Sequence, residues 1–252
     1  MSHTSTQSKD KHFDISRVPS HGFLILPLSM PKLCGDQSPK EIYKFLKFFD
    51  PKVKVISIDV IILYTNGLYF NTANGESLGF RQKSNSQILN HSRELKSMIL
   101  KEREYIPQAF HFLPWDYVLL NAPQYDEFKN KLLSHYRSDE QYRALIHEDL
   151  NGREVNPANV NFIAEELAIN HILRQKYVDL PSYLSKPDGW RLICYPGPTL
   201  KSDIATVQQS LLKNNPDFSG QDHFSRSFYD WKNQVIMDFD RMESVIKNRA
   251  VG

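Results

Sequence analysis

Hydrophobic residues along the chain fall into a few short continuous runs, and between these runs the apolar positions recur with helical spacing. Continuous apolar runs are typical of strands that are covered on both faces of a sheet, and β-branched residues favour strands further. The pattern therefore predicts strands at 23–28, 53–64, 109–115 and 191–196, the last of which is stopped by Pro-Gly-Pro.

Helices are predicted between these strands. Ser38 and Glu41 form a capping box with Pro39 at the first helical position, so a helix should begin there and end before Asp50-Pro51. The segment 66–82 is rich in Gly and Asn and is predicted to be a long loop. Further helices are predicted at 84–106, 124–138, 139–150, 156–175 and 206–213. The pattern at 233–249 fits either a strand followed by a helix or a single helix, and both stay open.

The order of these elements indicates the fold class. A strand, a capped helix and a second strand in direct succession form a βαβ unit, in which the two strands lie parallel. Strands and helices continue to alternate after it, so we expect an α/β fold with a doubly wound parallel sheet flanked by helices. A single domain is expected over residues 20–252, preceded by a flexible polar tail at 1–19.

Composition narrows the class of protein. The chain has 252 residues, enough for a sizeable core, and its formal net charge of +2 does not by itself indicate a nucleic-acid-binding protein. No apolar run approaches the roughly 20 residues of a membrane span, and the start of the chain lacks the apolar core of a signal peptide. Cys34 and Cys194 form no CxxC pair, and Cys34 is expected to be buried or half-buried. We therefore expect a soluble cytoplasmic protein.

Two predicted strand ends carry residues that could take part in catalysis. Ligands of doubly wound sheets bind beyond the carboxyl ends of the strands. Ser29 follows the first predicted strand, and Tyr195 and Pro196 end the last one. A serine is a weak nucleophile until a base or a proton-relaying group stands beside it. Because the sequence has no GxSxG elbow and no recognisable histidine triad, the candidate partners of Ser29 are the phenol of Tyr195 and the carboxylate of Glu166.

Each of these residues also has a plain structural interpretation. Ser29 could be the first polar residue of a turn, Tyr195 a core tyrosine, and Glu165 and Glu166 a solvated helix face. The sequence contains no GxGxxG, GxxxxGK[ST] or HExxH motif and no Cys/His cluster. We therefore predict neither a nucleotide cofactor nor a metal.

Lysine and arginine gather on the predicted helix 84–106 and just before it. Such a stripe can meet a phosphate backbone, although Glu94, Glu102 and Glu104 interrupt it and an ordinary solvated face is the alternative. The basic residues in question are Arg81, Lys83, Arg93, Lys96, Lys101 and Arg103.

Together these residues resemble the tRNA-dependent cyclodipeptide synthases. In that family the first strand ends in a serine, here LILPLS with Ser29, and a later strand ends in an aromatic dipeptide, here Tyr195-Pro196. The Tyr-Pro pair, with Lys32 rather than asparagine three residues after the serine, resembles the XYP subfamily. The helix NFIAEEL places Phe162 and Glu166 where the family has tyrosine and glutamate, and PQYDEF places Tyr125 on a family tyrosine. The resemblance covers roughly residues 20–200.

The resemblance implies a fold and an activity. The fold would be a single Rossmann-like domain, similar to the catalytic domains of class I tyrosyl- and tryptophanyl-tRNA synthetases. The activity would be an ATP-independent aminoacyl transfer from two aminoacyl-tRNAs, which yields a cyclic dipeptide (diketopiperazine). Catalysis would be ping-pong, through an aminoacyl and then a dipeptidyl ester of Ser29.

The resemblance also implies roles for individual residues. Glu166 would hold the substrate amine and move protons, with Glu165 as the alternative register, and Tyr195 would relay a proton. Phenylalanine at 162 lacks the hydroxyl of the family tyrosine. The basic helix would hold the tRNA, and the substrate would contact Phe162, Tyr125, Lys32, Pro196 and Pro27.

Three other functions fit the same pattern. One is a plain ligand-binding α/β protein, which would show no dependence on Arg93, Lys96 or Arg103. A serine hydrolase acting on an aminoacyl-tRNA or a small ester would release free amino acids without a cyclic product. A non-catalytic tRNA-binding module would keep its tRNA affinity after loss of Ser29. The sequence indicates neither the amino acids used nor the oligomeric state, for which a monomer is favoured.

Overall fold

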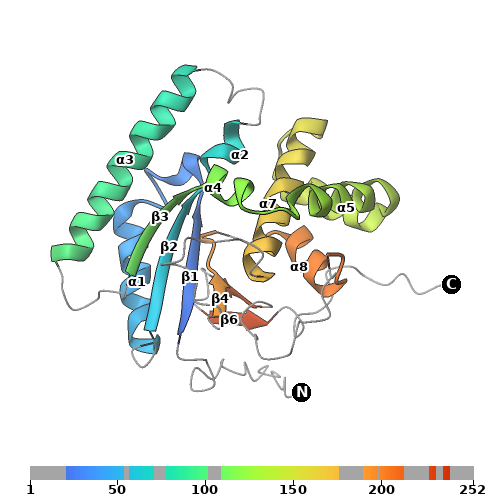
Figure 1. The fold of residues 1–252 in the computed structure, drawn as a ribbon. Helices are drawn as coiled ribbons and strands as arrows, with labels where there is room; N and C mark the ends of the chain where they lie inside the picture. The colour runs from blue at the N-terminus through green and yellow to red at the C-terminus, as the bar shows by residue number, and fades with distance from the viewer. Residues whose placement is uncertain are drawn as a thin grey trace, which may run out of the picture.

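One mixed sheet organises the chain. The computed structural model describes residues 21–53, 57–70, 78–101, 109–175, 190–197, 199–212, 227–230 and 235–238; the predicted tail at 1–19 lies outside them. Six strands follow the order β3-β2-β1-β4-β5-β6, parallel from β3 to β5 and antiparallel between β5 and β6 (Figure 1). The strands are β1 (His21–Leu28), β2 (Ser57–Tyr64), β3 (Ala109–Pro114), β4 (Trp190–Ile193), β5 (Ser227–Asp230) and β6 (Val235–Asp238).

Helices cover the sheet on both faces. Figure 1 shows α1 and α3 on one face, and α7 with α5 and α8 on the other. The helices are α1 (Pro39–Val53), α2 (Asn66–Phe70), α3 (Leu78–Lys101), α4 (Trp115–Leu120), α5 (Tyr125–Ser138), α6 (Glu140–Asp149), α7 (Pro157–Gln175) and α8 (Lys201–Gln208), with a short 3-10 turn η2 (Met30–Lys32) after β1.

The continuous apolar runs are explained by two cores, one on each face of the sheet. In β1, Leu24 and Leu26 join the core beneath α1 and α3, whereas Phe23 and Ile25 join the core beneath the helices of the opposite face. Because successive side chains of a strand point to opposite faces, both sets must be apolar. Fully burying such a side chain contributes about 1.5–3 kcal/mol.

The order of the strands creates a switch point. From β1 the chain builds β2 and β3 on one side, then crosses to place β4 and β5 on the other. Connections that leave a central strand in opposite directions open a crevice at its carboxyl end. In this fold the switch point lies between the ends of β1 and β4.

The α/β fold and its parallel strands confirm the prediction, and the predicted strands at 23–28, 53–64, 109–115 and 191–196 correspond to β1, β2, β3 and β4. Within the part of the chain that the structure describes, no helix is both long and apolar enough to cross a membrane.

Several boundaries differ from the prediction. Helix α1 runs through Asp50-Pro51 to Val53, because a proline this close to a helix end removes only one backbone hydrogen bond. The predicted loop at 66–82 contains α2 and the first turn of α3. Helix α8 begins at Lys201 rather than at 206, and β5 was not predicted. Of the segment 233–249, the structure describes strand β6 and leaves the remainder outside.

Candidate active site

Ser29 stands at the carboxyl end of β1, at the switch point. Its backbone is extended (φ −81°, ψ 126°), and the chain then turns into η2. The Ser29 N–H donates to Gln37 Oε1 at 2.6 Å, and its carbonyl accepts from the Lys32 N–H at 2.9 Å. Only 7% of the residue is exposed. Ser29 is therefore held on both sides of its backbone, in a largely buried position, rather than displayed in an open turn.

Tyr195 reaches the same place from β4. The Cys194 N–H donates to Ile25 O at 2.8 Å, which keeps the chain beside β1 up to this residue. Lys32 Nζ lies 3.2 Å from the Tyr195 hydroxyl and donates to it. Burial and the charge of Glu166 raise the pKa of Tyr195, while hydrogen bonds with the side chains of Gln37 and Ser29 lower it. Tyr195 is thus a neutral phenol in hydrogen-bond contact with Ser29.

Glu166 supplies a titratable carboxylate to the site. It lies on α7 and is half-buried. Burial, aided by the charges of Asp203 and Asp149, raises the pKa of Glu166 to about 7, against the opposing charges of Arg153 and Lys32. A carboxylate with a pKa near neutrality can both accept and return a proton, which is the property of a general acid–base group.

Glu165, the neighbouring carboxylate, faces a different set of groups. It is 2% exposed and accepts from Trp115 Nε1 at 3.0 Å and from the Tyr125 hydroxyl at 2.7 Å. Lys129 Nζ lies 3.4 Å from Oε2, the same oxygen that accepts from Tyr125. Three donors on one buried carboxylate are typical of a structural anchor. Adjacent helix positions point in different directions, which accounts for the separation of Glu165 from Glu166.

The structure brings some of the remaining predicted site residues to Ser29 and places others elsewhere. Lys32 contacts Tyr195, and the carbonyl of buried Pro196 accepts from Gln37 Nε2 at 3.0 Å. Pro27 is buried in β1, two residues before Ser29, and Tyr125 is engaged with Glu165. Phe162 is 7% exposed, and the guanidinium carbon of Arg153 lies 5.0 Å from the centre of its ring.

Sequence reasoning missed two residues of this region. Gln37 contacts both Ser29 and Pro196, and Arg153 lies over Phe162 with its charge acting on Glu166. Gln37 precedes a helix cap and Arg153 lies in the loop between α6 and α7, so neither follows a periodic pattern or a known motif. The only signal was position: Gln37 lies within the loop that follows the predicted nucleophile.

The basic residues of α3 lie on its outer face. His91, Leu95 and Ile99 are buried against the sheet, whereas the basic residues are exposed: Arg81, Lys83, Arg93, Lys96 and Lys101. Arg103 lies outside the described residues. The exposed face is compatible with a phosphate-binding surface and with a solvated helix alike.

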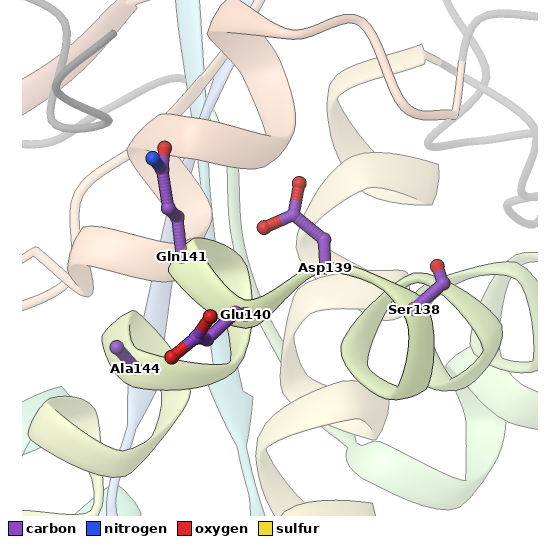
Figure 2. A pocket seen from close by; sticks show the side chains of 5 residues that line it. All are labelled: Ser138, Asp139, Glu140, Gln141 and Ala144. Atoms are coloured by element: carbon purple, nitrogen blue, oxygen red, sulfur yellow. The ribbon is translucent and has the colours of Figure 1, made fainter. Parts of the chain in front are cut away.

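Two further features lie apart from the candidate site. A hollow of about 520 Å³ lies at the junction of α5 and α6 (Figure 2) and contains no predicted site residue. It is lined by Ser138, Asp139, Glu140, Gln141 and Ala144. Cys34 is exposed, so the expectation that it is buried or half-buried was wrong; it lies in the turn after η2, where the side chain faces outward. Among the described residues, no three His, Cys, Asp or Glu side chains are grouped as a metal site.

Comparison with known proteins gives structural likenesses alone. No family model and no curated protein matches the sequence. A cyclodipeptide synthase from Candidatus Glomeribacter gigasporarum, solved bound to Phe-tRNAPhe, is 12% identical over 79% of this chain and 86% of its own, with a TM-score of 0.49.

Two further solved structures have similar values. A cyclodipeptide synthase from Staphylococcus haemolyticus is 15% identical over 74% of this chain and 83% of its own, with a TM-score of 0.48. A Mycobacterium tuberculosis protein, whose structure relates cyclodipeptide synthetases to type I tRNA synthetases, is 16% identical over 80% of this chain and 82% of its own, with a TM-score of 0.47. The function of this chain is therefore argued from its own residues.

Proposed function

We propose that this protein is a tRNA-dependent cyclodipeptide synthase of the XYP type, which joins the aminoacyl groups of two aminoacyl-tRNAs into a cyclic dipeptide. One observation carries the proposal: Ser29, at the end of β1, is in contact with Tyr195, at the end of β4, and Tyr195 feels the charge of Glu166. A serine, a phenol and a near-neutral carboxylate at the switch point form a set that can carry acyl groups and move protons.

In the first step, Ser29 attacks an aminoacyl-tRNA. Its Oγ forms a bond to the ester carbonyl carbon, and the bond from that carbon to the tRNA ribose oxygen breaks. The serine proton passes to the leaving ribose oxygen, and Tyr195, which contacts Ser29, is placed to relay it. The product is an aminoacyl ester of Ser29. The substrate ester is already activated, so the step needs no ATP.

The second step extends the acyl group on the enzyme. The amine of the aminoacyl-Ser29 attacks the ester carbonyl of a second aminoacyl-tRNA, and the second tRNA leaves. The dipeptide stays on Ser29 because the attacking amine belongs to the enzyme-bound residue. A neutral amine is required. Glu166, with its pKa raised to about 7, takes the proton that the amine loses and returns it to the leaving ribose oxygen of the second tRNA.

The last step releases the product. The free amine of the dipeptide attacks the carbonyl of the Ser29 ester, the bond from that carbonyl to Oγ breaks, and the cyclic dipeptide forms. Both reacting ends are tethered to one atom of the enzyme, so proximity supplies much of the rate. The basic face of α3 holds the aminoacyl-tRNAs. The protein acts in the cytoplasm, where such substrates occur.

Mass spectrometry after incubation with charged tRNAs tests the proposal. Wild-type protein is expected to form a cyclic dipeptide, and Ser29→Ala is expected to form none, because alanine has no hydroxyl to take the acyl group. Ser138→Ala, at the hollow between α5 and α6, is the matched control and should keep full activity. Circular dichroism should show all three proteins equally folded.

The same experiment separates two of the other functions. Free amino acids without a cyclic product, released faster than in a blank and lost in Ser29→Ala, would replace the proposal with an aminoacyl-tRNA hydrolase. Neither product from folded wild-type protein, together with tRNA binding that survives in Ser29→Ala, would leave a non-catalytic tRNA-binding module.

A further inference from the structure

Gln37 is a fully buried polar residue at the centre of the candidate site. It lies in the turn between η2 and α1, and none of its surface is exposed. Burying an amide is costly unless its donors and acceptors find partners. Its Oε1 accepts from the Ser29 N–H at 2.6 Å, and its Nε2 donates to Pro196 O at 3.0 Å. These two partners fix the orientation of the amide, since a flipped amide would set donor against donor and acceptor against acceptor.

The backbone of Gln37 is held as firmly as its side chain. Its N–H donates to Lys32 O at 3.1 Å, and its carbonyl accepts from His91 Nε2 at 2.8 Å. The other ring nitrogen of His91 lies 2.8 Å from the Tyr64 hydroxyl. Burial lowers the pKa of His91, so the ring is neutral, with its proton on Nε2 and a hydrogen bond accepted from Tyr64. Gln37 is therefore tied to β2 and α3 as well as to the ends of β1 and β4.

The contacts of the Tyr195 hydroxyl show what this arrangement does. Lys32 Nζ donates to the phenol oxygen at 3.2 Å, and an ammonium group has no acceptor. After its bond to Pro196, the amide nitrogen of Gln37 has one hydrogen left, and the Gln37 side chain also hydrogen-bonds to Tyr195. Once Ser29 is acylated, its Oγ carries no hydrogen and can only accept a hydrogen bond, so the phenol proton of Tyr195 is then the one that can reach it. The side chain of Ser29 is the third group bonded to Tyr195.

We propose that Gln37 is a positioning residue, which fixes the Ser29 backbone and aims the phenol proton of Tyr195 at Ser29 Oγ. The inference rests on the proposed function and assigns Gln37 to its last step. As the bond between Oγ and the dipeptidyl carbonyl breaks, Oγ takes the proton of Tyr195. The attacking amine loses one proton to Glu166, from which Tyr195 is reprotonated, so no proton is gained or lost overall. A misdirected phenol proton would slow the departure of Oγ and leave the acyl-enzyme in place.

A double-mutant cycle with Tyr195 tests this role. Gln37→Met keeps a similar volume and removes the amide. We expect it to lower the rate of cyclic dipeptide formation about tenfold or more, while acyl-Ser29 accumulates, as seen by intact-protein mass spectrometry in single turnover. In a Tyr195→Phe background, Gln37→Met should cause a clearly smaller loss, because the phenol proton is already absent and only the support of the Ser29 backbone remains to be lost. Gln141→Met, at the surface hollow, is the matched control and should change neither quantity.

A second variant distinguishes the loss of the amide donor from a folding defect. Gln37→Glu keeps the acceptor for the Ser29 N–H and loses the amide donor, so it should accumulate acyl-enzyme in the same way. An equal loss from Gln37→Met in the wild-type and Tyr195→Phe backgrounds, or a loss without acyl-enzyme in both Gln37 variants, would overturn the inference and make Gln37 a structural residue. Wild-type protein that forms no cyclic dipeptide would overturn the proposed function and this inference together, so the two failures are distinguishable.

Discussion

At the scale of single residues, two adjacent glutamates of α7 have different surroundings. Glu165 accepts hydrogen bonds from the indole of Trp115 and the phenol of Tyr125. Glu166 has a pKa raised to about 7 and acts electrostatically on Tyr195. A carboxylate whose acceptors are already occupied is poorly suited to take a proton from a substrate. We therefore propose Glu166 as the acid–base group and Glu165 as a structural residue.

Glutamine substitutions separate these roles. Glu166→Gln should lower the rate of cyclic dipeptide formation by about 10²–10⁴-fold, because the amide cannot accept the amine proton. Glu165→Gln should keep that rate within about tenfold and lower the free energy of unfolding by about 1–3 kcal/mol, because its amide nitrogen would face the donors of Tyr125 and Lys129. Product formation and urea denaturation measure the two effects. A stable but inactive Glu165→Gln beside an active Glu166→Gln would reverse the assignment.

At the scale of helices and strands, sequence patterns predicted correctly those elements whose burial follows from their own residues. Strands β1 and β2 are apolar over their length because both of their faces are covered, so the sequence reveals them without knowledge of their partners. Helix α8 is different, because its buried residues mix polar side chains with apolar ones. Asp203 is buried and paired with Arg174 of α7, and Ser202 donates to Asp149 of α6. Such partners are distant in the sequence, so no periodicity shows that α8 is buried.

The same distinction applies to the candidate site. Ser29 and Tyr195 could be predicted because they follow two strands of a parallel sheet, whose carboxyl ends share one edge. Gln37 could not be predicted, because its partners Ser29, Pro196 and His91 come from three elements that meet only in the folded chain. The choice between Glu165 and Glu166 needed the direction of each side chain, which spacing along α7 does not supply.

Helix α3 offers a test at this scale. Arg93 and Lys96 are exposed, whereas Leu95 and Ile99 of the same helix are buried. If the basic face of α3 binds the tRNA backbone, Arg93→Glu/Lys96→Glu should weaken tRNA binding at least tenfold and make the dependence of binding on salt less steep. Filter binding or fluorescence anisotropy at several salt concentrations measures both quantities.

A matched double variant controls for the change in net charge. Lys44→Glu/Lys131→Glu reverses two exposed or partly exposed lysines of α1 and α5, each of which is paired with a glutamate on its own helix. It should leave tRNA affinity within about twofold. Equal weakening in both double variants would mean that the effect comes from net charge, and the face of α3 would then be an ordinary solvated surface.

At the scale of the whole molecule, the fold gathers charges from distant segments around one carboxylate. Burial raises the pKa of Glu166 most, the charges of Asp203 of α8 and Asp149 of α6 raise it further, and Arg153 before α7 and Lys32 after β1 oppose them. These four groups come from segments spread along the chain, and they act together because α6, α7 and α8 pack against one another. The tuning of Glu166 is thus a property of the fold, and it links the site to the stability of the whole protein.

That link predicts how the free energy of unfolding varies with pH. The pKa of Glu166 is about 7 in the folded protein and near 4.5 in the unfolded chain. Between these values the folded state holds a proton that the unfolded state has released, so stability falls as pH rises from about 4.5 to 7. The difference between the two pKa values corresponds to at most about 3 kcal/mol, and water at the half-buried side chain reduces it to about 1–2 kcal/mol. Glu166→Gln cannot titrate, so the wild type should lose this stability relative to the variant across that range, as measured by urea denaturation. A difference between the two proteins that stays constant from pH 4.5 to 7.5 would show that Glu166 titrates normally and is not the tuned group of the site.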